Sequence, residues 1–184
     1  MSVAMRAFAE SAPVTQWPLR IVLVVVVLAV IALVLLAMRR GWQGRARRQV
    51  DIPAPESAPP PTWIADGPAI PGLFLGSTVS GDWLDRVVVH DLGVRSRAEL
   101  SVGPEGSLIA RTGARDVYIP RDDLRGARSD RGIAGKAYER DGVVVVTWQL
   151  GGRLIDTGFR ADPSWGQAAA LDGLLGLLAD ERTP

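Results

Sequence analysis

The side chains that most often carry chemistry are few in this sequence. It contains a single histidine, His90, and no cysteine. A protein zinc site needs several imidazole or thiolate ligands, and one histidine does not build it. His90 follows the apolar run 87–89, so we expect it to end a strand and to bond to a backbone group there.

Acidic pairs are the remaining candidates for holding a hard cation. Asp82 with Asp85 and Asp122 with Asp123 lack further oxygen ligands at fixed spacing, so we interpret both pairs as turn residues. Asp156 lies in a predicted strand and is expected to pair across strands. No phosphate-binding loop, nucleophile elbow, zinc-protease motif or dinucleotide fingerprint occurs. We therefore predict a non-enzymatic protein without catalytic residues, metal site or cofactor.

Basic residues gather in one later segment, where acidic residues interleave with them. Such a pattern is typical of a solvated face, and its alternative is a docking surface on which opposite charges fix the register of a protein partner. This candidate partner surface consists of Arg121, Arg125, Arg128, Arg131 and Lys136, among the acids Asp122, Asp123, Asp130 and Glu139.

The longest apolar stretch, 21–38, organises the whole chain. As a helix it would span about 27 Å, close to a bilayer core of roughly 30 Å. A buried core helix would carry polar residues every third or fourth position, and a signal peptide would be shorter and followed by a cleavage site. We predict an uncleaved transmembrane helix over 17–38. Its membrane-spanning positions include Ile21, Val24, Val27, Ile31, Leu35 and Met38.

Arginines are concentrated after this stretch, whereas only Arg6 and Arg20 precede it. Because basic residues stay on the cytoplasmic side, we predict a single-pass plasma-membrane protein with its N-terminus outside and its C-terminal domain cytoplasmic. Basic residues beside an anionic leaflet also contact its surface. The membrane-surface residues are Arg39, Arg40, Arg45, Arg47 and Arg48.

Composition divides the rest of the chain into three parts. We expect a disordered tail at 1–16, a basic juxtamembrane and proline-rich linker at 39–63, and one domain at 64–184. Prolines in the linker favour an extended spacer. Acidic residues outnumber basic ones in the domain, which argues against nucleic acid as a partner.

Short β-type runs separated by turn residues fill the domain. Gly103 to Gly106 and Gly151-Gly152 are predicted hairpin turns. The expected strands are 73–78, 86–90, 97–102, 107–111, 115–120, 124–131, 143–150 and 153–160. An amphipathic helix is expected after Asp162 and Pro163, with its end near Asp180. Its predicted apolar stripe is Trp165, Ala168, Ala169, Leu171, Leu174, Leu175 and Leu178.

Three segments carry a family resemblance: YIPRDDL at 118–124, GVVVVTW at 142–148 and LIDTGFR at 154–160. Residues 72–161 resemble the pleckstrin-homology-like (PH-like) domains of actinobacterial single-span membrane proteins. The resemblance implies about seven antiparallel strands in a barrel or sandwich, capped by a C-terminal α-helix, and it transfers no catalytic residue. The arginine-rich, lysine-poor composition is also typical of a high-GC actinobacterium.

PH domains that bind phosphoinositides use several basic residues of their first two strands. Here 73–89 offers only Arg86, so we do not expect specific headgroup recognition. The leading hypothesis is a membrane-anchored interaction or scaffold module that binds a protein partner at the inner face of the membrane. The alternatives are an accessory subunit of a transport or export complex and a domain that senses anionic lipid.

Overall fold

The structure is a computed structural model that describes residues 17–162 and 164–179. The chain divides into two compact units, residues 1–43 and 44–184, and each is described by itself. The predicted tail at 1–16 lies outside the described residues, as do Pro163 and the predicted helix end at Asp180.

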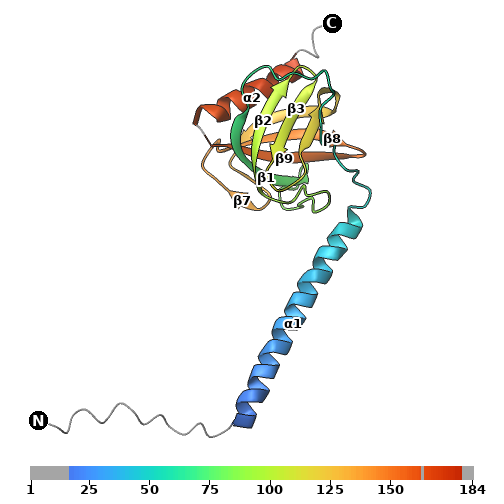
Figure 1. Cartoon of the computed structure of the whole chain (residues 1–184), viewed down its shortest axis with the longest axis vertical. Helices are drawn as coiled ribbons and strands as arrows, with labels where there is room; N and C mark the ends of the chain where they lie inside the picture. The colour runs from blue at the N-terminus through green and yellow to red at the C-terminus, as the bar shows by residue number, and fades with distance from the viewer. Residues whose placement is uncertain (1–16, 163, 180–184) are drawn as a thin grey trace, which may run out of the picture. The chain divides into compact units, whose positions relative to one another are not determined.

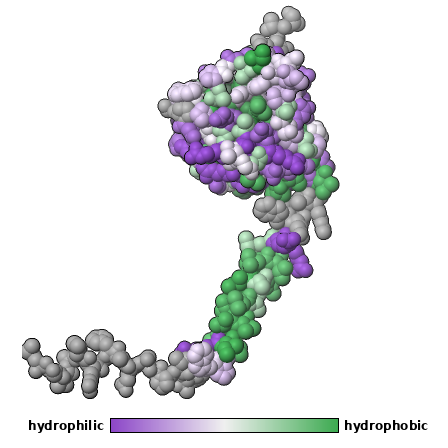
Figure 2. Space-filling model, in the orientation of Figure 1, coloured by the Kyte–Doolittle hydropathy of each residue, from purple (hydrophilic) through white to green (hydrophobic). Residues whose placement is uncertain are grey.

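One long helix, α1, covers Trp17–Arg48 and confirms the predicted helix at 17–38. Its large apolar side chains are exposed, and Figure 2 shows an apolar surface along it. Valine and isoleucine are weak helix formers in water. In lipid, however, a lone segment satisfies its backbone hydrogen bonds only as a helix.

The second unit is built on one antiparallel sheet of seven strands (Figure 1). The strand order is β4-β3-β2-β1-β9-β8-β5, so β4 and β5 are the edge strands and the sandwich is not closed. Its elements are β1 (Ile70–Val79), β2 (Ser96–Gly103), β3 (Gly106–Arg111), β4 (Val117–Pro120), the 3-10 turn η1 (Arg121–Asp123), β5 (Leu124–Asp130), β8 (Val143–Leu150) and β9 (Arg153–Ala161).

Both predicted hairpin turns are confirmed. Gly103 pairs with Gly106 across the turn between β2 and β3. Leu150 pairs with Arg153 between β8 and β9, around Gly151 in a left-handed conformation with φ of 56°. Glycine accepts this φ at no steric cost, which is why the turn can be this tight.

The predicted strand at 86–90 is wrong. Arg86 forms only an isolated bridge with Thr78, and the chain then leaves the sheet. His90 has a left-handed φ of 54°, which no regular strand contains. The apolar run that suggested a strand contributes to the core instead, because Val87 is fully buried there.

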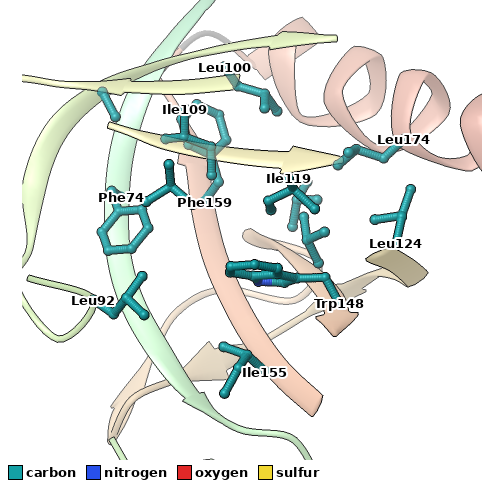
Figure 3. Close-up of a cluster of buried hydrophobic side chains, with 14 of the residues drawn as sticks. Phe74, Leu92, Leu100, Ile109, Ile119, Leu124, Trp148, Ile155, Phe159 and Leu174 are labelled. Carbon is teal, nitrogen blue, oxygen red and sulfur yellow. The ribbon is translucent and has the colours of Figure 1, made fainter. Parts of the chain in front are cut away.

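The main core lies between the bent sheet and α2 (Ser164–Ala179). Figure 3 shows its labelled members, which come from strands, a loop and α2: Phe74, Leu92, Leu100, Ile109, Ile119, Leu124, Trp148, Ile155, Phe159 and Leu174. The core also contains a short chain of hydrogen bonds between polar groups. Trp148 Nε1 donates to Thr157 Oγ1 at 2.9 Å, and Thr157 Oγ1 lies 2.8 Å from Ser77 Oγ.

A second apolar cluster lies on the other face of the sheet, under a short hairpin that the sequence patterns did not reveal. This hairpin pairs β6 (Gly132–Ile133) with β7 (Lys136–Ala137). Because both faces of the sheet are covered at β8, the sequence of this strand is a nearly continuous apolar run and does not alternate. The cluster consists of Leu75, Ile133, Ala134, Val143 and Val145.

The C-terminal helix is confirmed, but its predicted buried face is partly wrong. Leu174 is fully buried as expected, and Leu171 and Leu178 pack partly buried against the core. Trp165 remains 57% exposed. Because apolar residues occupy nearly every side of α2, their spacing does not select one face. The other buried apolar side chains of α2 are Ala170 and Leu177.

Residues 49–63, which we call the strap, pack against the domain where the sequence suggested an extended spacer. Ile52 is 1% exposed and belongs to the main core. The Asp51 carboxylate pairs with Arg153 of β9 at 2.8 Å. Burial of Ile52 and the Asp51–Arg153 ion pair thus both hold this segment on the fold.

The strap also covers the β4 edge of the sheet. Glu56 bridges Tyr118 in antiparallel fashion, and the ring of Trp63 meets the Tyr118 ring edge-on with centroids 6.3 Å apart. An uncovered edge presents unpaired backbone groups to other chains. The strap therefore protects β4 from such pairing.

Candidate functional site

The residues predicted to span the membrane all lie on α1. Their side chains are 48–67% exposed, and the stretch Trp17–Gly41 is long and apolar enough to cross a membrane. Arg39 and Arg40 are also exposed on this helix, while the side chains of Arg45, Arg47 and Arg48 lie outside the described part. Contact of these residues with lipid stays a prediction.

Gln49 fixes the start of the strap to the loop that follows β1. Its Nε2 donates to the Arg86 carbonyl at 3.0 Å, and its Oε1 accepts the Val88 amide at 2.8 Å. His90 Nε2 lies 2.9 Å from the Ile52 carbonyl oxygen. His90 thus has the backbone partner we expected, although it lies in a turn and not at a strand end.

The guanidinium of Arg86 is occupied within the domain. It donates to the Gly93 carbonyl at 2.9 Å and to the Ala134 carbonyl at 3.0 Å. These bonds hold the β6–β7 hairpin against the loop after β1. These bonds use two of the five N–H donors of Arg86, and the absence of specific headgroup recognition stays a prediction.

The acidic pairs form turns. Asp82 Oδ1 accepts the amides of Leu84 at 2.9 Å and Asp85 at 3.3 Å, which is the turn role we predicted for it. Asp122 and Asp123 belong to η1. Within the described residues no group of three or more His, Cys, Asp or Glu could hold a metal ion.

The mixed-charge segment is distributed over four places in the fold. Arg121 lies on η1, Arg125 and Arg128 on β5, Arg131 between β5 and β6, and Lys136 on β7. Across 17–162 and 164–179, only Arg128 of these five forms an ion pair. Their role as one partner surface stays a prediction.

Arg128 belongs to a polar row on the sheet. Its Nη2 donates to Asp156 Oδ2 at 2.8 Å, and Thr147 Oγ1 donates to Asp156 Oδ1 at 2.6 Å. The bond to Asp156 raises the pKa of Arg128, and Asp130 adds to the effect. Asp156 is thus the cross-strand partner we expected. Because this charge is satisfied internally, Arg128 is the weakest member of the predicted docking surface.

A polar cavity of about 400 Å³ between β1, β2 and β3 is lined in part by Arg111. This arginine is buried, its guanidinium stacks on Phe74 at 3.9 Å, and burial lowers its pKa. Four of its five N–H donors are engaged. The acceptors are Ser96 Oγ and the carbonyls of Asp91, Val94 and Arg115. Its role is to hold loops together.

An apolar groove of about 270 Å³ lies between α2 and the sheet, and the sequence analysis missed it. Trp165 and Ala169 line one side, and Leu100 and Val102 of β2 line the other. Figure 2 shows apolar surface patches on the otherwise largely polar domain. The sequence contained one signal for this groove, because α2 has more apolar residues than a single buried face would contain. The remaining lining residues are Asp66, Gly67, Pro68, Ile70 and Gly173.

An open antiparallel sandwich of seven strands with a helix packed over its core is the architecture of a PH-like domain. Residues 51–173 match the family described as Bacterial PH domain-like, and the chain belongs to this family. The match begins within the strap, in agreement with the burial of Ile52. No curated protein matches the sequence.

Proposed function

We propose that this protein is a membrane-anchored, non-enzymatic adaptor. Its helix α1 spans the bilayer once, and its PH-like domain binds a segment of a partner protein at the cytoplasmic membrane surface. Family membership supports the non-enzymatic part, since Bacterial PH-like domains are typically non-catalytic. The arginines that follow the apolar stretch support the orientation.

The observation that carries the proposal is the groove between α2 and β2. Trp165 at its wall is 57% exposed, which is unusual for a large aromatic residue beside an apolar depression. Exposed tryptophan is enriched where proteins bind one another. A groove of this size accommodates one or two apolar side chains of a bound segment.

Charge beside the groove defines the partner segment further. The exposed Asp66 lines the groove, and the exposed Asp172 precedes Gly173, which also lines it. Neither forms an ion pair within the described residues. The complementary ligand is a short segment with apolar anchors and a flanking lysine or arginine.

Topology is tested by labelling the cysteine-free chain with a membrane-impermeant maleimide in intact cells. Single-cysteine variants Ser2→Cys and Thr112→Cys report on the two ends, and Thr112 is exposed on the domain. We expect labelling of Ser2→Cys before lysis and of Thr112→Cys only after lysis. The reverse pattern would overturn the orientation, and labelling of both before lysis would overturn the cytoplasmic location.

Partner binding is tested with a photo-crosslinking amino acid placed in the full-length protein. We compare Trp165 in the groove, Arg121 in the mixed-charge segment and Thr112 as the control. We expect an adduct from position 165 alone, mapped to an apolar partner peptide with a flanking basic residue and lost in the variant Ala169→Asp. An adduct from position 121 alone would move binding to the mixed-charge surface and overturn the groove assignment.

A further inference from the structure

Four large apolar side chains are exposed around one end of the domain. Trp83 is 54% exposed and Leu84 is 61% exposed, both in the loop after β1. Val50 is 77% exposed at the start of the strap, and Leu154 is 43% exposed on β9. We call these four residues the apolar tip.

Hydrogen bonds place the segments of the apolar tip beside one another. The amide of Ser80, at the end of β1, donates to the Leu154 carbonyl at 2.9 Å. Val79 donates its amide to the Asp85 carbonyl at 2.9 Å and accepts the Asp82 amide at 3.1 Å, and these two bonds close the loop that carries Trp83. Gln49, next to Val50, is bonded to the residues directly after this loop.

The covalent chain limits how far the start of the strap can lie from the end of the apolar helix. The stretch able to cross a membrane ends at Gly41, and Gln49 is already bonded to the domain. Residues 42–48 reach at most about 25 Å when fully extended. As the helix that α1 forms up to Arg48, they rise only about 10 Å.

We propose that the apolar tip rests in the interfacial layer of the bilayer that α1 spans, an inference that depends on the proposed membrane anchor. Tryptophan prefers this layer because its ring is apolar and its indole N–H is polar. The ligand is the lipid surface itself and not a particular headgroup. Asp82 and Asp85 flank Trp83, and carboxylates there disfavour anionic headgroups.

This placement leaves the groove beside Trp165 free for a partner. The groove includes Ile70, where β1 begins, whereas Trp83 follows Val79, where β1 ends. Ten residues of strand separate these ends by roughly 33 Å along its path. One end of the domain thus meets lipid while the other faces away from it.

The test is spin-label depth measurement on the full-length protein in phosphatidylcholine nanodiscs. The absence of native cysteine allows single labels at Trp83→Cys, at Trp165→Cys as the equally exposed control, and at Ile31→Cys within the helix. We expect the labels at 83 and 31 to collide more with oxygen than with an aqueous nickel complex, and the label at 165 to show the opposite. Adding anionic lipid should leave the depth at 83 unchanged.

Each of the other outcomes overturns one part of the proposal. An aqueous label at 83 together with a lipid-exposed label at 31 would overturn the apolar tip and leave the anchor standing. An aqueous label at 31 would overturn the anchor as well. Lipid-exposed labels at both 83 and 165 would overturn the assignment of the contact to one end of the domain. A depth at 83 that requires anionic lipid would overturn a contact that is independent of the headgroup. Leu84→Cys repeats the test should Trp83→Cys fail to fold.

Discussion

At the scale of single residues, Thr157 is the acceptor around which the polar part of the core is arranged. Its hydroxyl bonds both Trp148 Nε1 and Ser77 Oγ in a fully buried position. We predict that Thr157→Val lowers the free energy of unfolding by about 1–3 kcal/mol, because the buried indole N–H loses its acceptor. Urea unfolding of the full-length protein in detergent, followed by tryptophan fluorescence, measures the change.

The control for this variant is Thr112→Val, the same substitution at an exposed site on the turn after β3. It should change the free energy of unfolding by less than about 0.5 kcal/mol. Equal effects of the two substitutions would show that the hydroxyl of Thr157 contributes nothing specific.

Tyr118 makes the stability of the domain sensitive to alkaline pH. Its hydroxyl donates to the Glu105 carbonyl at 2.8 Å, and burial, Glu105 and Glu56 raise its pKa. A raised pKa means that the folded state holds the phenolic proton more tightly than the unfolded state. The contribution to stability is therefore fully present below about pH 10, the unfolded pKa, and is lost as pH rises through the folded pKa.

The measurement is the urea midpoint of wild type and Tyr118→Phe between about pH 8 and pH 11. We expect the midpoint of the wild type to fall more steeply over this range, because the variant has no phenol at this site. The only other tyrosine, Tyr138, is present in both proteins and cancels in the comparison. Parallel curves would contradict the raised pKa of Tyr118.

At the scale of elements, the β6–β7 hairpin depends on the absence of a side chain at Gly158. A Cβ there would meet Ile133 Cγ2 at 2.4 Å, so Ile133 fills the space above this glycine. We predict that Gly158→Ala costs about 1–3 kcal/mol and releases the hairpin, visible as faster amide hydrogen exchange over 131–138. Gly126→Ala, whose Cβ would lie 4.0 Å from its nearest neighbour, is the control.

A second variant separates this clash from a general loss of stability. Adding Ile133→Ala to Gly158→Ala removes the colliding methyl group. The double variant should then cost less than the sum of the single changes. Additive costs would mean that Gly158 matters for another reason.

Most elements of the sheet could be predicted from the sequence, and the failures have identifiable causes. Runs such as 143–150 and 153–160, joined by two glycines, specify a hairpin locally. The run at 86–90 has the same apolar character but a histidine with positive φ at its end, and side-chain spacing does not reveal φ. Likewise, α2 is apolar on too many sides for its period to select the buried face.

The candidate site was harder to predict than the fold because it depends on contacts between distant segments. The groove joins α2 to the start of β1, and the apolar tip joins the strap to a loop and to β9. No local pattern predicts such neighbours. The spanning helix was predictable, because composition alone defines it.

At the scale of the whole molecule, the strap makes the stable domain begin before residue 64. Ile52→Ala should cost about 2–5 kcal/mol, the usual cost of truncating a core isoleucine, whereas Ser57→Ala at an exposed site of the strap should cost less than about 0.5 kcal/mol. A chain of residues 44–184 should likewise unfold at higher urea than residues 64–184. Equal midpoints for the two chains would show that the strap is dispensable.

The position of the strap between α1 and the sheet also determines where a pulling force would act. A load applied to α1 reaches the domain first at Gln49 and then at Asp51 and Ile52, because these are the first residues of the strap that contact it. The strap is held by separate contacts and the sheet by strand ladders, so we expect tension to detach the strap before it disrupts the strands. Once released, residues 49–63 can extend to at most roughly 50 Å. The strap would then act as an extensible tether that unfolds under load while the sheet stays folded.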